Sequence, residues 1–186
     1  MRPKWLKLQI DVQCRISTGE LTYMNYHNIT KDDMLNGDGL RTVLWVAGCN
    51  HQCKECQNPI TWDPDGGLEF DQAAKDELFE ILSRDYISGI TFSGGDPLFP
   101  GNRNDVTELA REIRERFPGK TVWLYTGYTY EEIKSLEIME YLDVLVDGEF
   151  EIDKLDLQAK WRGSINQRVI DVPQTRKLGQ IVLFCD

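Results

Sequence analysis

The stretch that decides the fold runs from residue 42 to residue 56 and reads TVLWVAGCNHQCKEC. Its first six residues form an apolar run, which is typical of a buried strand. Three cysteines follow at once, Cys49, Cys53 and Cys56, in the spacing C-x3-C-x2-C. A cubane iron–sulfur cluster normally takes four thiolate ligands. Three thiolates leave one iron open, and an open coordination position is where a metal site does chemistry.

Two other interpretations of the three cysteines stay open. Their spacing is i, i+4, i+7, so they would share one face of a helix, and buried cysteine is a common small apolar residue. The flanking Gly48 and Asn58-Pro59 favour a loop instead. A structural zinc site needs a fourth ligand, and only His51 is near enough in the sequence to provide it. The pattern and its setting favour the open cluster.

The composition indicates one globular domain of ordinary kind. The chain has 186 residues, of which 41% are hydrophobic, and a net charge of −10. This length is sufficient for a proper core, and the acidic balance argues against a nucleic-acid partner, because phosphate binding needs basic patches. No stretch is long and apolar enough to span a membrane. Five cysteines, three of them in one loop, indicate a reducing compartment, and we expect a cytoplasmic protein.

We expect residues 24–186 to form a single domain, with residues 1–23 as an N-terminal extension of uncertain role. The extension carries basic residues but no continuous apolar core, so it is not a convincing secretory signal. Met24 could be the true start, or residues 6–12 could add an edge strand to the domain. The two remaining cysteines, Cys14 and Cys185, lie far from the cysteine loop and are interpreted as structural or incidental.

Strands and helices alternate after the cysteine loop. Apolar periodicity predicts helices at 72–84 and 105–117, and Thr129 with Glu132 forms a capping-box pattern for a third helix that ends near residue 141. Further strands are predicted at 89–92, 121–125, 142–146 and 181–184. This order predicts an α/β fold with parallel strands. A closed barrel takes about 250 residues, so we expect a partial (βα) barrel.

Unusual residues follow the ends of four predicted strands, in the cysteine loop and at 93–96, 126–128 and 147–148. In parallel α/β architectures this edge of the sheet is where active sites form, so the four segments should meet at one rim. Gly94 and Gly95 would let the backbone approach a ligand closely, and Asp96 would supply a charge suited to a cationic ligand. A tight turn capped by Asp96 is the alternative.

These motifs together resemble the radical S-adenosylmethionine superfamily, and more narrowly the activating proteins of anaerobic (class III) ribonucleoside-triphosphate reductase. Several short motifs in the right order are more specific than any one of them. Besides the cysteine loop they are MNYH at 24–27, NGDG at 36–39, QNPITW at 57–62, SGGDPL at 93–98, WLYTGY at 123–128, DVLVDG at 143–148 and WRGSINQR at 161–168.

The resemblance implies a radical S-adenosylmethionine oxidoreductase of the partial-barrel fold. Cys49, Cys53 and Cys56 would hold one 4Fe–4S cluster, whose open iron binds the amino and carboxylate groups of S-adenosylmethionine. Reductive cleavage would give methionine and a 5′-deoxyadenosyl radical, which takes a hydrogen atom from a glycine Cα of the reductase large subunit. A flavodoxin-type protein would donate the electron. The cofactor carries the chemistry, so no catalytic residue beyond the cluster site is expected.

The resemblance also assigns contacts with S-adenosylmethionine. Gly94, Gly95 and Asp96 would contact its methionine portion. Glu55 and Gln57, on either side of the third cysteine, lie where the superfamily contacts the adenosyl portion. Many members carry an aromatic residue next to that cysteine, and this chain does not.

Several polar residues of the other motifs have open roles. Of the two histidines, His27 lies outside the strand ends. His51 could be a proton shuttle, but a polar filler of the cysteine loop is favoured. Asp147 could face the ligand. Arg162 and Arg168 could dock the partner, but pairing with surface acids is favoured, because exposed ion pairs are common.

Three alternative functions remain, two of them radical enzymes and one a non-catalytic module. An activase of another glycyl-radical enzyme, of the pyruvate formate-lyase type, would share the cysteine loop but is expected to carry Gly-Gly-Glu and a longer barrel. A small radical enzyme of modified-base biosynthesis belongs to the same class. A non-catalytic iron–sulfur or zinc module is the third alternative, but an electron carrier would need a fourth thiolate to close the cluster.

Overall fold

A computed structural model describes residues 24–185, so the predictions about residues 1–23 lie outside the described residues. The elements are β1 (Asn25–Asp33), β2 (Arg41–Val46), β3 (Leu68–Glu69), α1 (Gln72–Leu82), β4 (Gly89–Gly94), α2 (Arg103–Arg116), β5 (Thr121–Tyr125), α3 (Tyr130–Ile133), β6 (Val144–Asp147), β7 (Arg168–Asp171) and α4 (Val172–Leu178). Short 3-10 helices cover Pro59–Thr61, Glu137–Glu140 and Ile152–Lys154.

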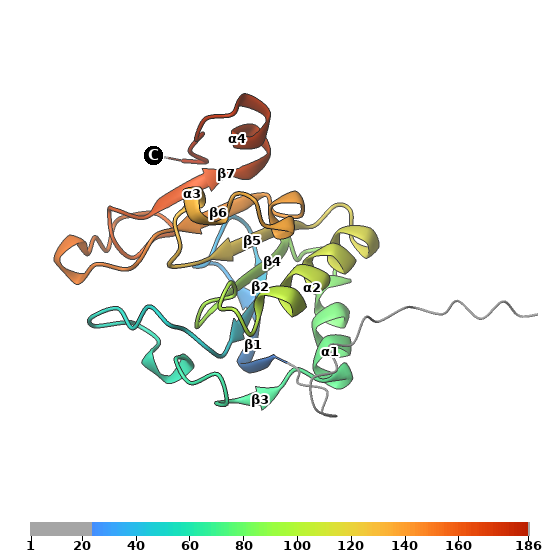
Figure 1. Ribbon diagram of the computed structural model, residues 1–186. Helices are drawn as coiled ribbons and strands as arrows, with labels where there is room; N and C mark the ends of the chain where they lie inside the picture. The colour runs from blue at the N-terminus through green and yellow to red at the C-terminus, as the bar shows by residue number, and fades with distance from the viewer. Residues whose placement is uncertain (1–23, 186) are drawn as a thin grey trace, which may run out of the picture.

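The strands form one mixed sheet in the order β3-β1-β2-β4-β5-β6-β7 (Figure 1). The pairs β2–β4, β4–β5 and β5–β6 are parallel, as predicted. The expectation of parallel strands is wrong at both edges, where β1 pairs with β2, β3 with β1 and β7 with β6 in antiparallel fashion. Within residues 24–185, no crossover helix joins these edge strands to their sheet neighbours, and antiparallel neighbours need none. The predicted α/β class is confirmed, because helices alternate with the strands of the parallel centre of the sheet.

Two predicted elements are shorter than expected. The helix expected to end near residue 141 stops after one turn at Ile133 and is followed by the 3-10 helix Glu137–Glu140. Its start is correct, because Thr129 and Glu132 do form a capping box. The strand expected at 181–184 is reduced to a single bridge between Leu183 and Ile170.

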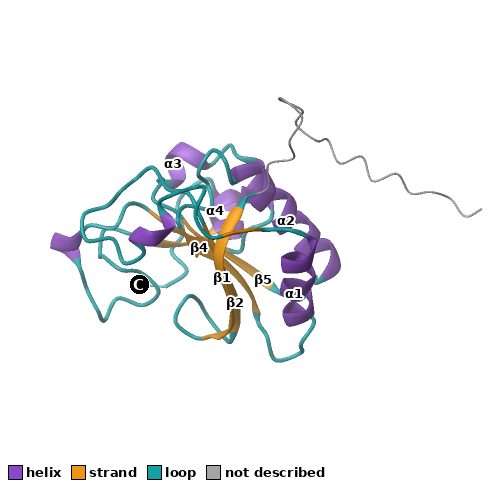
Figure 2. Cartoon of the chain, turned by 90° about the horizontal axis from the view of Figure 1, so that it is seen from below, coloured by secondary structure: helices purple, strands orange, loops and turns teal. Residues whose placement is uncertain are grey.

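Helices α1 and α2 lie together on one side of the sheet (Figure 2). Alternation along the strands explains this arrangement, because every second residue of β2 and β4 turns an apolar side chain to the helices. The main core between the helices and the sheet includes Leu44, Val46, Ile90, Phe92, Leu78, Leu82, Leu109 and Ile113.

No long helix covers the opposite face of the sheet within the described residues. A second, smaller cluster lies there, formed by Trp123, Val144, Val146 and Val169, with Trp161 and Cys185 packed against it. The carboxyl ends of the parallel strands stay open beside this cluster. Within residues 24–185, none of the helices has the length and apolarity that a bilayer crossing requires.

Candidate functional site

A pocket of about 190 Å³ lies at the carboxyl ends of the parallel strands. Seven of the eight site residues predicted from the sequence line it: Cys49, Cys53, Cys56, Gln57, Gly94, Gly95 and Asp96. The eighth, Glu55, is exposed and is not part of the lining. A shallower depression of about 500 Å³ lies between α1 and α2 and carries no cysteine, so we place the chemistry at the smaller pocket.

Backbone hydrogen bonds tie the cysteine loop to the Gly-Gly-Asp turn. The parallel pairing of β2 and β4 ends at Val46 and Gly94. Beyond it, the Gly95 amide donates to the Val46 carbonyl (2.8 Å), and the Asp96 amide donates to the Gly48 carbonyl (2.8 Å). A Cβ on Gly95 would lie 2.5 Å from the Gly48 oxygen. The second glycine is therefore required by the close approach of the two chains.

The three cysteines are free and half-buried. The loop that carries them curls through two left-handed residues, Gln52 (φ 48°) and Glu55 (φ 57°). The Asn58 amide donates to the Cys56 sulfur at 3.4 Å. Burial raises the pKa of the Cys49 and Cys53 thiols, while backbone amides that point at both sulfurs act in the opposite direction. Amide donors around a sulfur stabilise the thiolate that a metal requires.

The donor set fits an iron–sulfur cluster better than a zinc ion. Among residues 24–185, no group of three or more Cys, His, Asp or Glu side chains is arranged to hold one metal ion. A zinc site needs its four ligands around a single ion, whereas each thiolate on a cubane binds a different iron. Three free sulfurs that line one pocket, with amides directed at them, suit the larger group.

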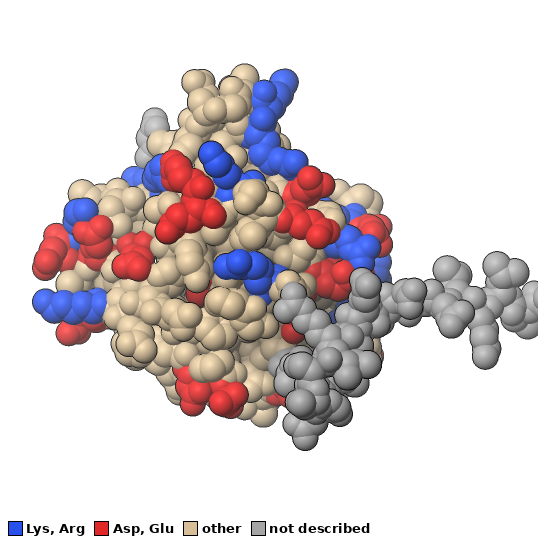
Figure 3. Space-filling model, in the orientation of Figure 1, with Lys and Arg blue, Asp and Glu red and all other residues tan. Residues whose placement is uncertain are grey.

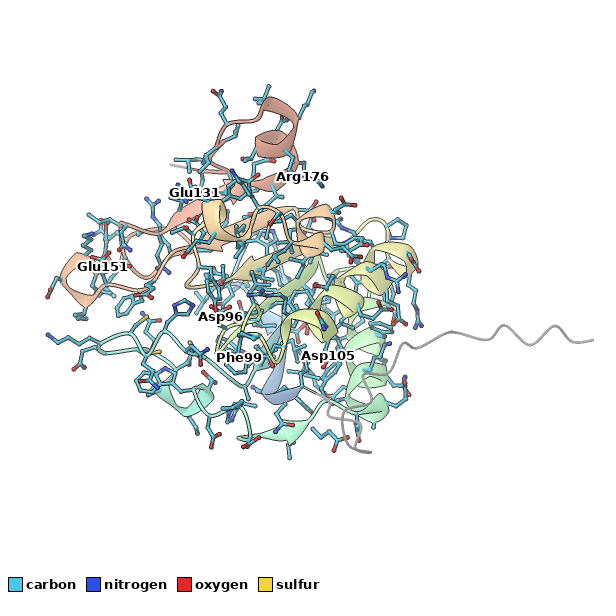
Figure 4. The ribbon with its side chains drawn as sticks, viewed as in Figure 1. Asp96, Phe99, Asp105, Glu131, Glu151 and Arg176 are labelled. Carbon is cyan, nitrogen blue, oxygen red and sulfur yellow. The ribbon has the colours of Figure 1, made fainter. Side chains whose placement is uncertain are left out.

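Asp96 is the acceptor at which several loops meet (Figure 4). Its buried carboxylate accepts hydrogen bonds from the Leu98 amide (2.7 Å), the Thr126 hydroxyl (2.9 Å) and the Gly127 amide (3.0 Å). His51 Nε2 lies 2.8 Å from the same group. The Asp96 carboxylate was expected to face a cationic ligand. In the structure it forms its hydrogen bonds with groups of the protein itself.

His51 is a functional candidate whose contacts the sequence interpretation missed, because only a proton shuttle or a zinc ligand was weighed against the favoured polar filler. Expected as a polar filler, it contacts Asp96 through Nε2 and Glu149 Oε1 through Nδ1, the latter at 2.9 Å. The hydrogen bond with Asp96, followed by the one with Glu149, raises the pKa of His51 to about 9. Glu149 was also missed, because nothing in the sequence connects residue 149 to residue 51.

The polar residues at the end of β6 and beyond it form hydrogen bonds mainly with one another. Asp147 accepts from the Tyr130 amide (2.7 Å) and from Arg168 Nε (3.0 Å). Arg168 also reaches Glu131 at 2.8 Å, so the favoured pairing interpretation is confirmed for this arginine. Arg162 instead donates to the Gln167 carbonyl at 3.2 Å. Asp147 therefore supports the fold of this rim.

Comparisons with known proteins identify the family of this chain. Residues 35–170 match the family model of a 4Fe–4S single cluster domain. The chain is 46% identical over 146 residues to the anaerobic ribonucleoside-triphosphate reductase-activating protein of Enterobacteria phage T4, over 78% of this chain and 93% of that one. The proteins of the same name from Escherichia coli K12 (41% over 150 residues; 78% and 97%) and Vibrio cholerae (40% over 148 residues; 77% and 96%) are similar. The chain therefore belongs to the family of anaerobic ribonucleoside-triphosphate reductase-activating proteins.

Proposed function

We propose that this chain is a radical S-adenosylmethionine oxidoreductase that generates a glycyl radical on the anaerobic ribonucleoside-triphosphate reductase. The observation that carries the proposal is that three free cysteines and the Gly94-Gly95 turn line the same pocket. The names of the relatives supply the partner, and the matching 4Fe–4S domain supplies the cofactor.

In this proposal Cys49, Cys53 and Cys56 hold the 4Fe–4S cluster. When bound, the cluster would supply the electron for cleavage of the S–C5′ bond of S-adenosylmethionine, which would give methionine and a 5′-deoxyadenosyl radical. Transfer of a hydrogen atom from a glycine Cα of the reductase would then give 5′-deoxyadenosine and the glycyl radical. The protein positions the reactants and excludes water and oxygen. A flavodoxin-type protein is the proposed donor of the electron.

The same proposal gives the other predicted site residues their tasks. Gly94 and Gly95 offer backbone carbonyl and amide groups to the methionine portion of S-adenosylmethionine. Asp96, which also lines the pocket, contacts the same portion and holds that turn in shape. Gln57 lines the pocket where the adenosyl portion would bind, which supports its contact. Glu55 is exposed and contributes through its main chain.

We further propose that the four parallel strands form a partial (βα) barrel of the radical S-adenosylmethionine type. Residues 24–186 would be a single domain, with residues 1–23 as its extension. The clustering of three of the five cysteines in one loop supports a cytoplasmic location. Figure 3 shows acidic and basic side chains interspersed on the visible face, which supports a protein partner over a nucleic acid.

Anaerobic reconstitution with iron and sulfide tests the proposal. We expect the reduced protein to release 5′-deoxyadenosine from S-adenosylmethionine and to produce a glycyl-type EPR doublet on a class III reductase subunit. Cys53→Ser should abolish both, whereas the matched variant Cys185→Ser, outside the pocket lining, should retain them. Release of the nucleoside without a partner radical would overturn the assigned substrate, and zinc uptake in place of a cluster would overturn the mechanism.

A further inference from the structure

We propose that His51 is a positioning residue that locks the cysteine loop to the Gly-Gly-Asp turn and to the segment after β6. The inference rests on the proposed function and adds a residue to it. The imidazole ring lies between two carboxylates from different segments, with Nε2 2.8 Å from Asp96 and Nδ1 2.9 Å from Glu149. Figure 4 shows Asp96 between the cysteine loop and the segment that carries Glu151. One side chain thus joins three loops of the rim.

The chemistry of the two partners makes this link stronger than ordinary hydrogen bonds. A carboxylate accepts hydrogen bonds and cannot donate them, so both ring nitrogens must carry a hydrogen to satisfy both contacts. The ring is then a cation between two anions, and charge-assisted hydrogen bonds are roughly twice as strong as neutral ones. The side chains of His51 and Asp96 are only 11% and 2% exposed, whereas that of Glu149 is 56% exposed. Solvent weakens the contact with Glu149, so the contact with Asp96 carries the link.

The ring also has no freedom to move sideways. It packs edge-to-face on Tyr128, with ring centroids 4.7 Å apart. On another side lies Gly127, where an added Cβ would approach His51 Cδ2 to 2.5 Å. Asp96 is itself fixed by Thr126 and by the Gly127 amide. Both the ring and its main acceptor are therefore held by contacts on more than one side.

The place of the ring in the loop determines what the link controls. His51 stands midway between Cys49 and Cys53, and Asp96 follows Gly94-Gly95 directly. A fixed distance between His51 and Asp96 therefore fixes two cysteines relative to the glycine backbone. In the proposed function S-adenosylmethionine spans this distance. Loss of the link should affect its binding more than assembly of the cluster, because all three cysteines remain.

Two substitutions and a matched control test the role of His51. We expect His51→Ala to retain the wild-type iron content after reconstitution, to raise the KM for S-adenosylmethionine roughly tenfold and to change kcat less. The change that S-adenosylmethionine causes in the EPR spectrum of the reduced cluster should shrink. His51→Gln should recover part of the KM, because its amide can still donate to Asp96. His27→Ala, at the other histidine of the chain, should behave as the wild type.

Two further variants approach the ring from its neighbours. Gly127→Ala should reproduce the raised KM of His51→Ala, because the new methyl group displaces the ring. Glu149→Gln should raise the KM less, and it should add nothing in the His51→Ala background, since groups acting through one another are not additive.

The outcomes separate this inference from the function on which it rests. An unchanged KM in His51→Ala, beside an active wild type, overturns the positioning role, and so does loss of iron from that variant. A wild type that does not cleave S-adenosylmethionine overturns the proposed function instead. In that case a lower free energy of unfolding of cluster-free His51→Ala than of cluster-free His27→Ala would still support the link, and equal values would overturn it.

Discussion

Arg41, the first residue of β2, is a charged side chain that the sheet buries completely. Each of its five N–H groups has an acceptor. The acceptors are Thr91 Oγ1 (2.8 Å), Thr121 Oγ1 (2.8 Å) and the carbonyls of Asp38 (3.0 Å), Ile90 (2.5 Å) and Thr121 (3.0 Å). Burial lowers the pKa of the guanidinium to about 10, so it stays charged near neutral pH. Arg41 therefore links β2, β4 and β5 on the face opposite α1 and α2.

Removing this side chain should weaken the whole sheet. We expect Arg41→Met to lower the free energy of unfolding by roughly 3 kcal/mol, because several buried acceptors lose their donor at once. Arg41→Lys should also destabilise, since an ammonium cannot reproduce the planar fork. Urea denaturation of the cluster-free protein measures both effects.

An exposed ion pair supplies the control for Arg41. Lys31 lies 3.0 Å from Glu77, and their side chains are 53% and 45% exposed. Lys31→Met should change the free energy of unfolding by less than about 0.5 kcal/mol. If Arg41→Met proved as stable as Lys31→Met, the buried hydrogen bonds would contribute nothing net.

At the scale of the elements, β2 and β4 approach so closely at their carboxyl ends that a side chain cannot fit between them. Gly94 has φ +105°, a conformation that other residues rarely adopt, and a Cβ there would lie 2.7 Å from both the nitrogen and the oxygen of Val46. The strand end and the cysteine loop that follows β2 are thus coupled through this glycine.

Gly94→Ala should therefore damage both stability and the site. Strained backbone costs about 1–3 kcal/mol by itself, and the clash with β2 adds to it, so we expect a loss of at least about 2 kcal/mol in urea denaturation. The iron content after reconstitution should fall with it. Gly119→Ala is the matched control, because a Cβ at Gly119 has nothing within 4 Å. Normal iron content in Gly94→Ala would contradict the coupling.

Local patterns predicted the central elements and missed those that depend on distant partners. The apolar runs that became β2, β4 and β5 are buried on both faces, so their composition alone indicates a strand. Strand β1 (NYHNITKDD) is largely polar, and β7 has only four residues, so pairing with neighbours far along the chain makes them strands. The link between residues 51, 96 and 149 was out of reach for the same reason. The cysteines and the Gly-Gly-Asp turn were accessible because their chemistry lies in short motifs.

At the scale of the whole molecule, the two faces of the sheet are covered by different kinds of structure. Two helices cover one face, and the other is covered near the pocket by an aromatic cluster of Trp123, Trp161 and Phe184. The ring centroid of Trp123 lies 4.9 Å from that of Trp161 and 5.2 Å from that of Phe184. The Phe184 amide donates to the Val169 carbonyl (2.7 Å), which holds Phe184 against β7. Phe184 and Cys185 therefore pack on the smaller core cluster of this face.

This arrangement predicts that Phe184→Ala loosens the aromatic cluster without affecting the cysteine loop. Trp123 is only 1% exposed, so removal of the ring above it should admit water and shift tryptophan fluorescence to longer wavelength. The free energy of unfolding should fall by about 1–2 kcal/mol, less than for a fully buried phenylalanine, because Phe184 is 41% exposed.

Leu178→Ala, at a 56% exposed position in α4, should change neither the fluorescence nor the free energy of unfolding. The iron content should stay at the wild-type level, since the cysteine loop is held by β2 and β4. A loss of iron in Phe184→Ala alone would mean that the chain end supports the pocket as well as the sheet.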